Sequence, residues 1–174
     1  KPKMVVGHFT LGRVFVALGE HSKAIKHFKR TLEIDPIYPD AYFEMGQSFF
    51  EQNKFNEAAQ AFKDTLELSP NYFEAYIGIG LAYINSNRNE EAIEPLKNAI
   101  TINPGYADSY EHLGAAYRNL GEHEKALSPY LDFARIDFRS PVAHFKLGVA
   151  YSRLGRDRDA IKSFQEATRL NKEF

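Results

Sequence analysis

The sequence predicts an all-α fold, a solenoid of five 34-residue helix-turn-helix repeats. Three observations lead to this prediction: a ladder of glycines, a ladder of alanines with the same step, and apolar residues at helical spacing between them. The ladders consist of Gly12, Gly46, Gly80, Gly114 and Gly148, and of Ala24, Ala58, Ala92, Ala126 and Ala160. Because glycine makes up about 7% of an average sequence, five glycines at five preassigned positions would arise by chance about once in a million.

The period divides the chain into five repeats without insertion or deletion, and we treat them as a single domain over residues 1–174. The repeats cover residues 5–38, 39–72, 73–106, 107–140 and 141–174. Each repeat is predicted to form two antiparallel helices of about 14 residues, each about 21 Å long. Such a pair cannot bury both of its faces alone, so neighbouring repeats are expected to stack.

A proline near the end of each of the first three repeats predicts where the second helix stops. In the third repeat, apolar residues recur at helical spacing up to Tyr83, a polar stretch follows over 85–89, and a second apolar run continues until Pro104. Pro36 and Pro70 occupy the equivalent places in the first two repeats. Proline cannot continue a helix, so these positions mark where the second helices stop.

The fourth repeat departs from this pattern. Phe138 stands where the earlier repeats have proline, and the large Phe133 is followed by the small Ala134. We therefore expect a local distortion where the fourth repeat meets the fifth. Pro95 and Pro129 lie inside the second helices of the third and fourth repeats and are expected to bend them.

Small residues at two places in each repeat predict a close crossing of the paired helices. A glycine inside a helix costs about 1 kcal/mol relative to alanine, so its return in every repeat predicts a compensating gain in packing. Large side chains next to this contact would fill the remaining space. They form a ladder of their own, which consists of Phe28, Phe62, Leu96, Tyr130 and Phe164.

Composition and charge exclude several classes of protein. The net charge is −1, with 22 Lys and Arg against 23 Asp and Glu, which argues against binding to nucleic acid or an anionic membrane. The chain has no cysteine, which excludes disulfides, thiolate metal sites and cysteine nucleophiles. No apolar run approaches the roughly 20 residues that a membrane helix needs. The chain starts with Lys1, so we expect a fragment or processed product. The sequence does not decide the cellular compartment, although the cytoplasm is favoured.

Sites for chemistry are not evident in the sequence. There is no Gly-Lys-Ser or Gly-Lys-Thr loop for phosphate, and the 6 histidines do not have metal-ligand spacing. No arrangement of serine, histidine and aspartate for nucleophilic catalysis can be deduced. We therefore predict no catalytic residue, no metal, no cofactor and no enzymatic activity.

The repeat pattern resembles the tetratricopeptide repeat family. The resemblance rests on the glycine and alanine ladders, on the large residues listed with them, and on a ring at the fourth position of each repeat, where His8, Tyr42, Tyr76, Tyr110 and His144 stand. It implies a right-handed superhelix that serves as a protein–protein interaction scaffold. In this family the first helices line a concave groove that holds an extended peptide or a partner helix.

The resemblance also implies which side chains would face that groove. The candidate partner-binding residues are Phe9, Arg13, Phe43, Glu44, Gln47, Phe50, Ile77, Leu81, Ile84, Glu111, His112, Arg118, Phe145, Lys146, Val149 and Arg153. Their apolar members form a stripe that fits a partner site. The alternative is that these rings only complete the packing between adjacent first helices. His112 would let binding respond to pH.

Charge gives a second indication about the partner. Acidic residues outnumber basic residues in repeats two to four, and several of them fall on the implied groove, namely Asp40, Glu44, Glu51, Glu74, Asp108 and Glu111. We therefore expect a protein or peptide ligand with apolar anchors and some basic residues. The alternative is a solvated charged face. The lysine and asparagine pattern with which one subfamily holds the carboxylate tails of chaperones is missing, so that ligand is not expected.

Two other functions stay open at this point. The chain could be a regulatory or substrate-recruiting part of a larger enzyme. It could also self-assemble, because the last repeat lacks the family's usual C-terminal solvating helix and would expose an apolar face.

Overall fold

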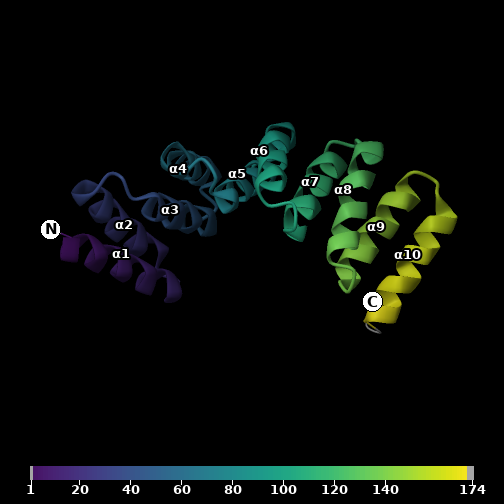
Figure 1. Cartoon of the computed structure of the whole chain (residues 1–174), viewed down its shortest axis with the longest axis horizontal. Helices are drawn as coiled ribbons and strands as arrows, with labels where there is room; N and C mark the ends of the chain where they lie inside the picture. Colours follow the sequence, from purple (N-terminus) through teal and green to yellow (C-terminus); the bar gives the residue numbers. More distant parts are fainter. Residues whose placement is uncertain (1, 172–174) are drawn as a thin grey trace. The chain divides into compact units, whose positions relative to one another are not determined.

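The computed structural model describes residues 2–171, and in that range it contains ten α-helices and no strand (Figure 1). The helices are α1 (Pro2–Ala17), α2 (His21–Ile34), α3 (Pro39–Glu51), α4 (Phe55–Leu68), α5 (Phe73–Asn85), α6 (Asn89–Ile102), α7 (Ala107–Asn119), α8 (His123–Ile136), α9 (Pro141–Arg153) and α10 (Asp157–Leu170). The predicted all-α class is confirmed. None of these helices is both long enough and apolar enough to cross a membrane.

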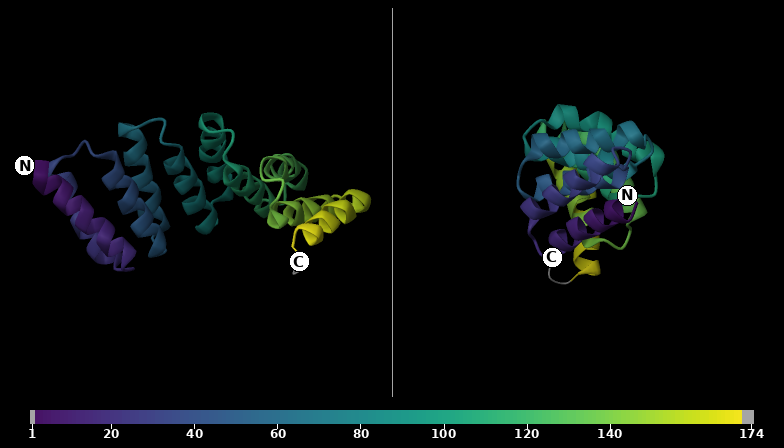
Figure 2. Two further views of the ribbon diagram at one scale, coloured as in Figure 1. Left: turned by 60° about the horizontal axis from the view of Figure 1, so that its bottom comes forward. Right: turned by 90° about the vertical axis from the view of Figure 1, so that its left-hand side faces the viewer.

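The chain divides into two compact units, Lys1–Arg88 and Asn89–Phe174, which we call the N-terminal and C-terminal units. The N-terminal unit holds α1 to α5, and each helix packs on the next. The C-terminal unit holds α6 to α10 in the same way. Within each unit, successive helices run antiparallel, as the further views show for α1 with α2 and for α9 with α10 (Figure 2). The boundary between the units falls between the two helices of the predicted third repeat.

The glycine ladder marks where the paired helices approach most closely. A Cβ atom built on Gly12 would lie 2.4 Å from Cε1 of Phe28, and one on Gly46 would lie 2.7 Å from the same atom of Phe62. Gly148 stands in the same relation to the ring of Phe164. Gly12, Gly46, Gly114 and Gly148 therefore each make room for the large ring of the second helix in the same repeat. This confirms the predicted close crossing and explains the glycine inside these helices.

Most of the other ladder residues lie in the cores of the two units, together with further apolar side chains. All five ladder alanines are buried, as are Phe28, Phe62 and Tyr130. In the fourth repeat, Phe133 and Ala134 are both buried, whereas Phe138 is exposed. Pro95 and Pro129 lie inside α6 and α8, which continue through them.

The turns between paired helices share a backbone conformation. Gly19, Asn53, Asn87, Gly121 and Gly155 all have a positive φ, between 58° and 77°. Glycine adopts this left-handed conformation without steric cost, and asparagine tolerates it better than most residues. The same residue types at the same place in each repeat therefore end each first helix at a tight turn.

Candidate partner-binding surfaces

The first surface lies on the first helices of the N-terminal unit. Helix α3 contacts both α1 and α5, and the candidate residues Arg13 of α1 and Glu44 of α3 form an ion pair, so the candidates lie on neighbouring helices. Arg13 and Gln47 are exposed, and the remaining candidates of this unit, apart from Ile77, are half-buried. Ile77 is only 8% exposed, and its side chain offers little surface to a partner.

Aromatic contacts hold this face in place. The ring of Phe43 lies 4.8 Å from that of Tyr72 and 5.5 Å from that of Phe62, measured between ring centroids. Phe9 packs in the same way, 5.0 Å from Tyr38 and 5.9 Å from Phe28. These rings contribute to the packing within the unit, which is the alternative to partner binding that the sequence left open for the apolar stripe. Phe9 and Phe43 are half-buried, so part of each side chain also stays exposed to solvent.

An acidic cluster stands beside Phe43 on α3. Glu44 pairs with Arg13 of α1, with 3.4 Å between Oε1 and Nε. Burial raises the pKa of Glu44, Arg13 lowers it, and the nearby Asp40 raises it further. The hydroxyl of Tyr72 donates to Asp40 Oδ1 at 3.2 Å, and burial together with Asp40 raises the pKa of Tyr72 to about 12. The cluster therefore holds two carboxyl groups, of Asp40 and Glu44, beside the single cation Arg13.

The second surface is a pocket of about 180 Å³ in the C-terminal unit. It is formed by residues of α7, α8 and α9, which are Arg118, His123, Ala126, Tyr130, Phe145, Lys146, Val149, Ala150 and Arg153. The structure thus brings five predicted candidates together in one place: Arg118, Phe145, Lys146, Val149 and Arg153. Phe145 packs on Phe164 of α10, with 5.6 Å between ring centroids, and forms part of the apolar wall.

The remaining two candidates lie on α7, beside this pocket. Glu111 forms an ion pair with Lys146 of α9. Burial lowers the pKa of His112, while Glu111 and Asp108 act in the opposite direction. His112 is therefore held neutral at neutral pH and charges only in acid.

Sequence reasoning did not include one residue that lines this pocket, Tyr130 of α8. Its ring lies against Gly114, with 2.8 Å from Cε1 to a Cβ built there. Its hydroxyl is buried and has no hydrogen-bond partner among residues 2–171, and burial raises its pKa. The signal was present in the ladder, because Tyr130 is the only member of that ladder with a polar atom in its side chain.

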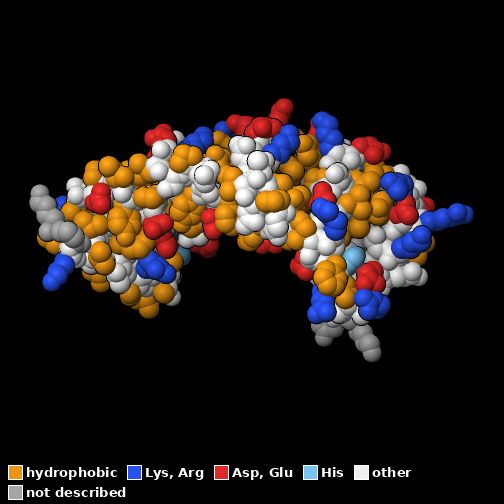
Figure 3. Space-filling view, viewed as in Figure 1, with side chains coloured by type: hydrophobic (Ala, Val, Ile, Leu, Met, Phe, Trp, Pro, Cys, Tyr) orange, Lys and Arg blue, Asp and Glu red, His pale blue; other side chains and the backbone are white. Residues whose placement is uncertain are grey.

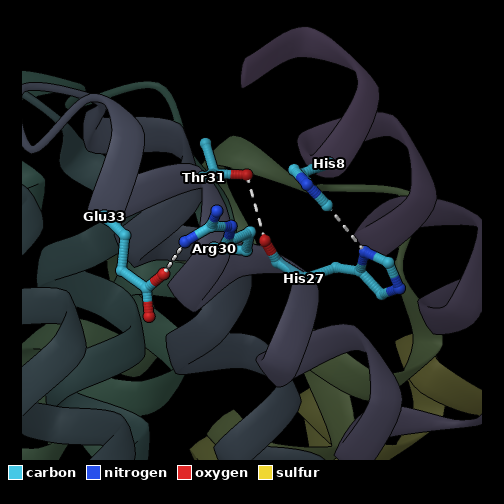
Figure 4. Close-up of polar contacts among 5 residues, drawn as sticks. All are labelled: His8, His27, Arg30, Thr31 and Glu33. Carbon is cyan, nitrogen blue, oxygen red and sulfur yellow. Dashed lines mark hydrogen bonds and ion pairs between the residues drawn. The ribbon is translucent and has the colours of Figure 1, made fainter. Parts of the chain in front are cut away.

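Helix α1 carries an exposed apolar face and one half of a histidine pair. Large hydrophobic side chains are exposed along α1, among them Val6, Leu11 and Val14, and hydrophobic side chains gather over this end of the N-terminal unit (Figure 3). His8 of α1 contacts His27 of α2, with 3.2 Å between their Nδ1 atoms (Figure 4). No third ligand joins them, since residues 2–171 contain no group of three side chains suited to a metal ion.

Comparison with known proteins supports the repeat assignment. Models of the tetratricopeptide repeat match residues 12–52, 43–107, 96–128 and 141–174. No curated protein matches the chain significantly.

Among solved structures, a crystal structure of MamA is 29% identical, with a TM-score of 0.88 over 93% of this chain and 95% of that one. A second MamA structure is 27% identical, with a TM-score of 0.91 over 99% and 94%. YrrB, described as a protein with an unusual peptide-binding site, is 18% identical, with a TM-score of 0.80 over 95% and 85%. These likenesses confirm the predicted all-α solenoid.

Proposed function

Because the chain belongs to the tetratricopeptide repeat family, we propose that its first helices bind a partner peptide with apolar and basic residues. The family and the fold support an interaction scaffold in general. The finer statement, that the partner lies along α1, α3 and α5, is our proposal. YrrB has the same fold and is described with a peptide-binding site, so this architecture can present one.

The observation that carries the proposal is the combination of rings and carboxylates on α3. Phe43 and Phe50 are half-buried and are held by aromatic neighbours, Phe50 by Phe55 at 5.3 Å between centroids. A surface that is already ordered lowers the entropy cost of binding. Asp40 and Glu44 lie on the same helix and supply negative charge for a lysine or arginine of the partner.

Gln47 offers the sharpest test, because it is exposed on this face and its replacement disturbs no core contact. We would measure, by fluorescence anisotropy, the binding of two labelled peptides with the same Phe-Leu-Phe anchor. One would have lysine flanks and the other glutamine flanks. The lysine peptide should bind more tightly. Gln47→Arg should weaken its binding at least about tenfold, or about 1.4 kcal/mol.

Gln60→Arg is the matched control. Gln60 is exposed on α4, a second helix of the same unit, and the substitution adds the same charge. It should leave both affinities unchanged. Equal binding of the two peptides, or full binding by Gln47→Arg, would contradict the proposal.

A further inference from the structure

The pocket among α7, α8 and α9 differs in charge from the surface on α3. We propose that it holds the side-chain carboxylate of an aspartate or glutamate in a bound peptide segment, with Tyr130, Arg118 and Arg153 as donors. The inference rests on the proposed function and adds a second ligand chemistry to it. All the groups that carry it lie within the C-terminal unit.

The size of the pocket suits a single side chain. Its volume is about 180 Å³, and a cavity of about 150 Å³ takes one benzene ring. Sites for drug-sized small molecules occupy about 300–1,000 Å³. The pocket is therefore large enough for one anchoring residue of a peptide and too small for a typical free cofactor.

The charges that face the pocket are mostly positive. Lys146 is neutralised by its ion pair with Glu111. Arg118 donates to the neutral amide oxygen of Asn119 at 3.1 Å, and Arg153 is exposed without an ion-pair partner in the described part of the chain. Within residues 2–171, the guanidinium groups of Arg118 and Arg153 thus line the pocket without an ion-pair partner. Guanidinium groups bind carboxylates through paired hydrogen bonds.

The hydroxyl of Tyr130 is the second, independent observation. It is buried and has no hydrogen-bond partner in the part of the chain that the structure describes, which is an unfavourable state for a polar group. The fold does not need it, because Phe28, Phe62 and Phe164 fill the same place in other repeats without a hydroxyl. Since burial raises the pKa of Tyr130, its hydroxyl stays protonated and can donate. A carboxylate only accepts hydrogen bonds, so it is the complementary ligand.

The apolar wall defines the neighbouring part of the ligand. Phe145 and Val149 line the same pocket, and they would contact the methylene groups of the acidic residue and an apolar residue beside it. Because burying a second negative charge against such a wall costs free energy, we commit to a single carboxylate flanked by apolar side chains.

The test is an amide NMR titration of the full chain with two capped tripeptides at millimolar concentration. They are acetyl-Phe-Glu-Phe-amide and acetyl-Phe-Gln-Phe-amide, which differ only in the carboxylate. The glutamate peptide should shift the amides of α7 and α9 around Arg118, Phe145 and Arg153, and should bind about tenfold more tightly than the glutamine peptide. A third peptide, acetyl-Phe-Gln-Phe with a free C-terminal carboxylate, distinguishes a terminal from a side-chain carboxylate.

Two variants and a control separate binding from folding. Tyr130→Phe and Arg153→Gln should each weaken the glutamate peptide about fivefold and leave the glutamine peptide unchanged. Arg158→Gln removes the same charge from an exposed position on α10 and should change neither. Tyr130→Phe should melt at the same temperature as the parent or higher, because it only removes an unpartnered hydroxyl.

Four results would overturn the inference: no shifts on α7 and α9, equal affinity for the capped peptides, tighter binding of the free-carboxylate peptide, or full binding by Tyr130→Phe. If the lysine-flanked peptide still binds the N-terminal unit in a Gln47-dependent way, the proposed function stands while this inference fails.

Discussion

Replacing Gly12 by alanine tests the packing that Gly12 shares with Gly46, Gly114 and Gly148. The new Cβ would lie 2.4 Å from Cε1 of Phe28, about 1.0 Å inside the 3.4 Å at which ordinary van der Waals contact begins. Phe28 is fully buried and packs on Phe9, so its ring cannot move away freely. Overpacking of this kind costs about 1–3 kcal/mol, and the severe overlap places the cost near the upper end. Alanine gains about 1 kcal/mol in helix propensity, so the net loss should be about 1–2 kcal/mol.

Gly7 on the same helix is the matched control. A Cβ built there meets no atom within 4 Å, so Gly7→Ala should gain the propensity term of up to about 1 kcal/mol. The two substitutions are chemically identical, and their effects should have opposite signs. Urea unfolding followed by circular dichroism would measure both. If Gly12→Ala stabilised the chain as much as Gly7→Ala, the packing explanation of the glycine ladder would be refuted.

The other predictions concern pH and the turns. Burial lowers the pKa of His112 from its ordinary value of 6.5, so the unfolded chain takes up this proton first as the pH falls. The stability that neutral His112 contributes is therefore complete above about pH 6.5 and is lost as the pH falls toward its lowered folded-state pKa. The urea midpoint should fall between pH 7.5 and pH 5, and this fall should be smaller in His112→Gln than in the parent chain. Gly155 has a φ of 68° and no atom within 4 Å of an added Cβ. Gly155→Ala should cost about 1–2 kcal/mol through backbone strain alone. Gly155→Asn should cost less, because Asn53 and Asn87 adopt this conformation in other repeats, and equal thermal midpoints for the two variants would argue against it.

Much of the fold could be predicted because it repeats. A single glycine at Gly46 says little, but the same residue every 34 positions indicates a close approach, and the ring of Phe62 lies at that place. The hairpin turns followed from the polar breaks, although the left-handed residues Asn53 and Asn87 were not singled out. Residues that recur at the same position of each repeat pack in the same way, so this part of the structure could be predicted from the sequence.

The candidate surfaces were less predictable, since position within a repeat sets the face of a helix but not how far its neighbours cover it. Ile77 and Phe43 hold the same position in successive repeats, yet Ile77 is buried and Phe43 is half-buried. The pairs Arg13 with Glu44 and Lys146 with Glu111 join different first helices, and only coordinates reveal such partners. The sequence placed Tyr130 in the core because of its ring. Only the structure shows that its buried hydroxyl has no hydrogen-bond partner in the described part of the chain.

The central claim is that the first helices present the binding surfaces. The most direct measurement is a selection of random peptides on the immobilised full chain, followed by amide NMR mapping of the strongest binders. We predict that their shifts fall on α1, α3 and α5, or on α7 and α9 with Tyr130. Binders that map to the outer faces of α2, α4 or α10, or a selection without any shared sequence feature, would contradict it.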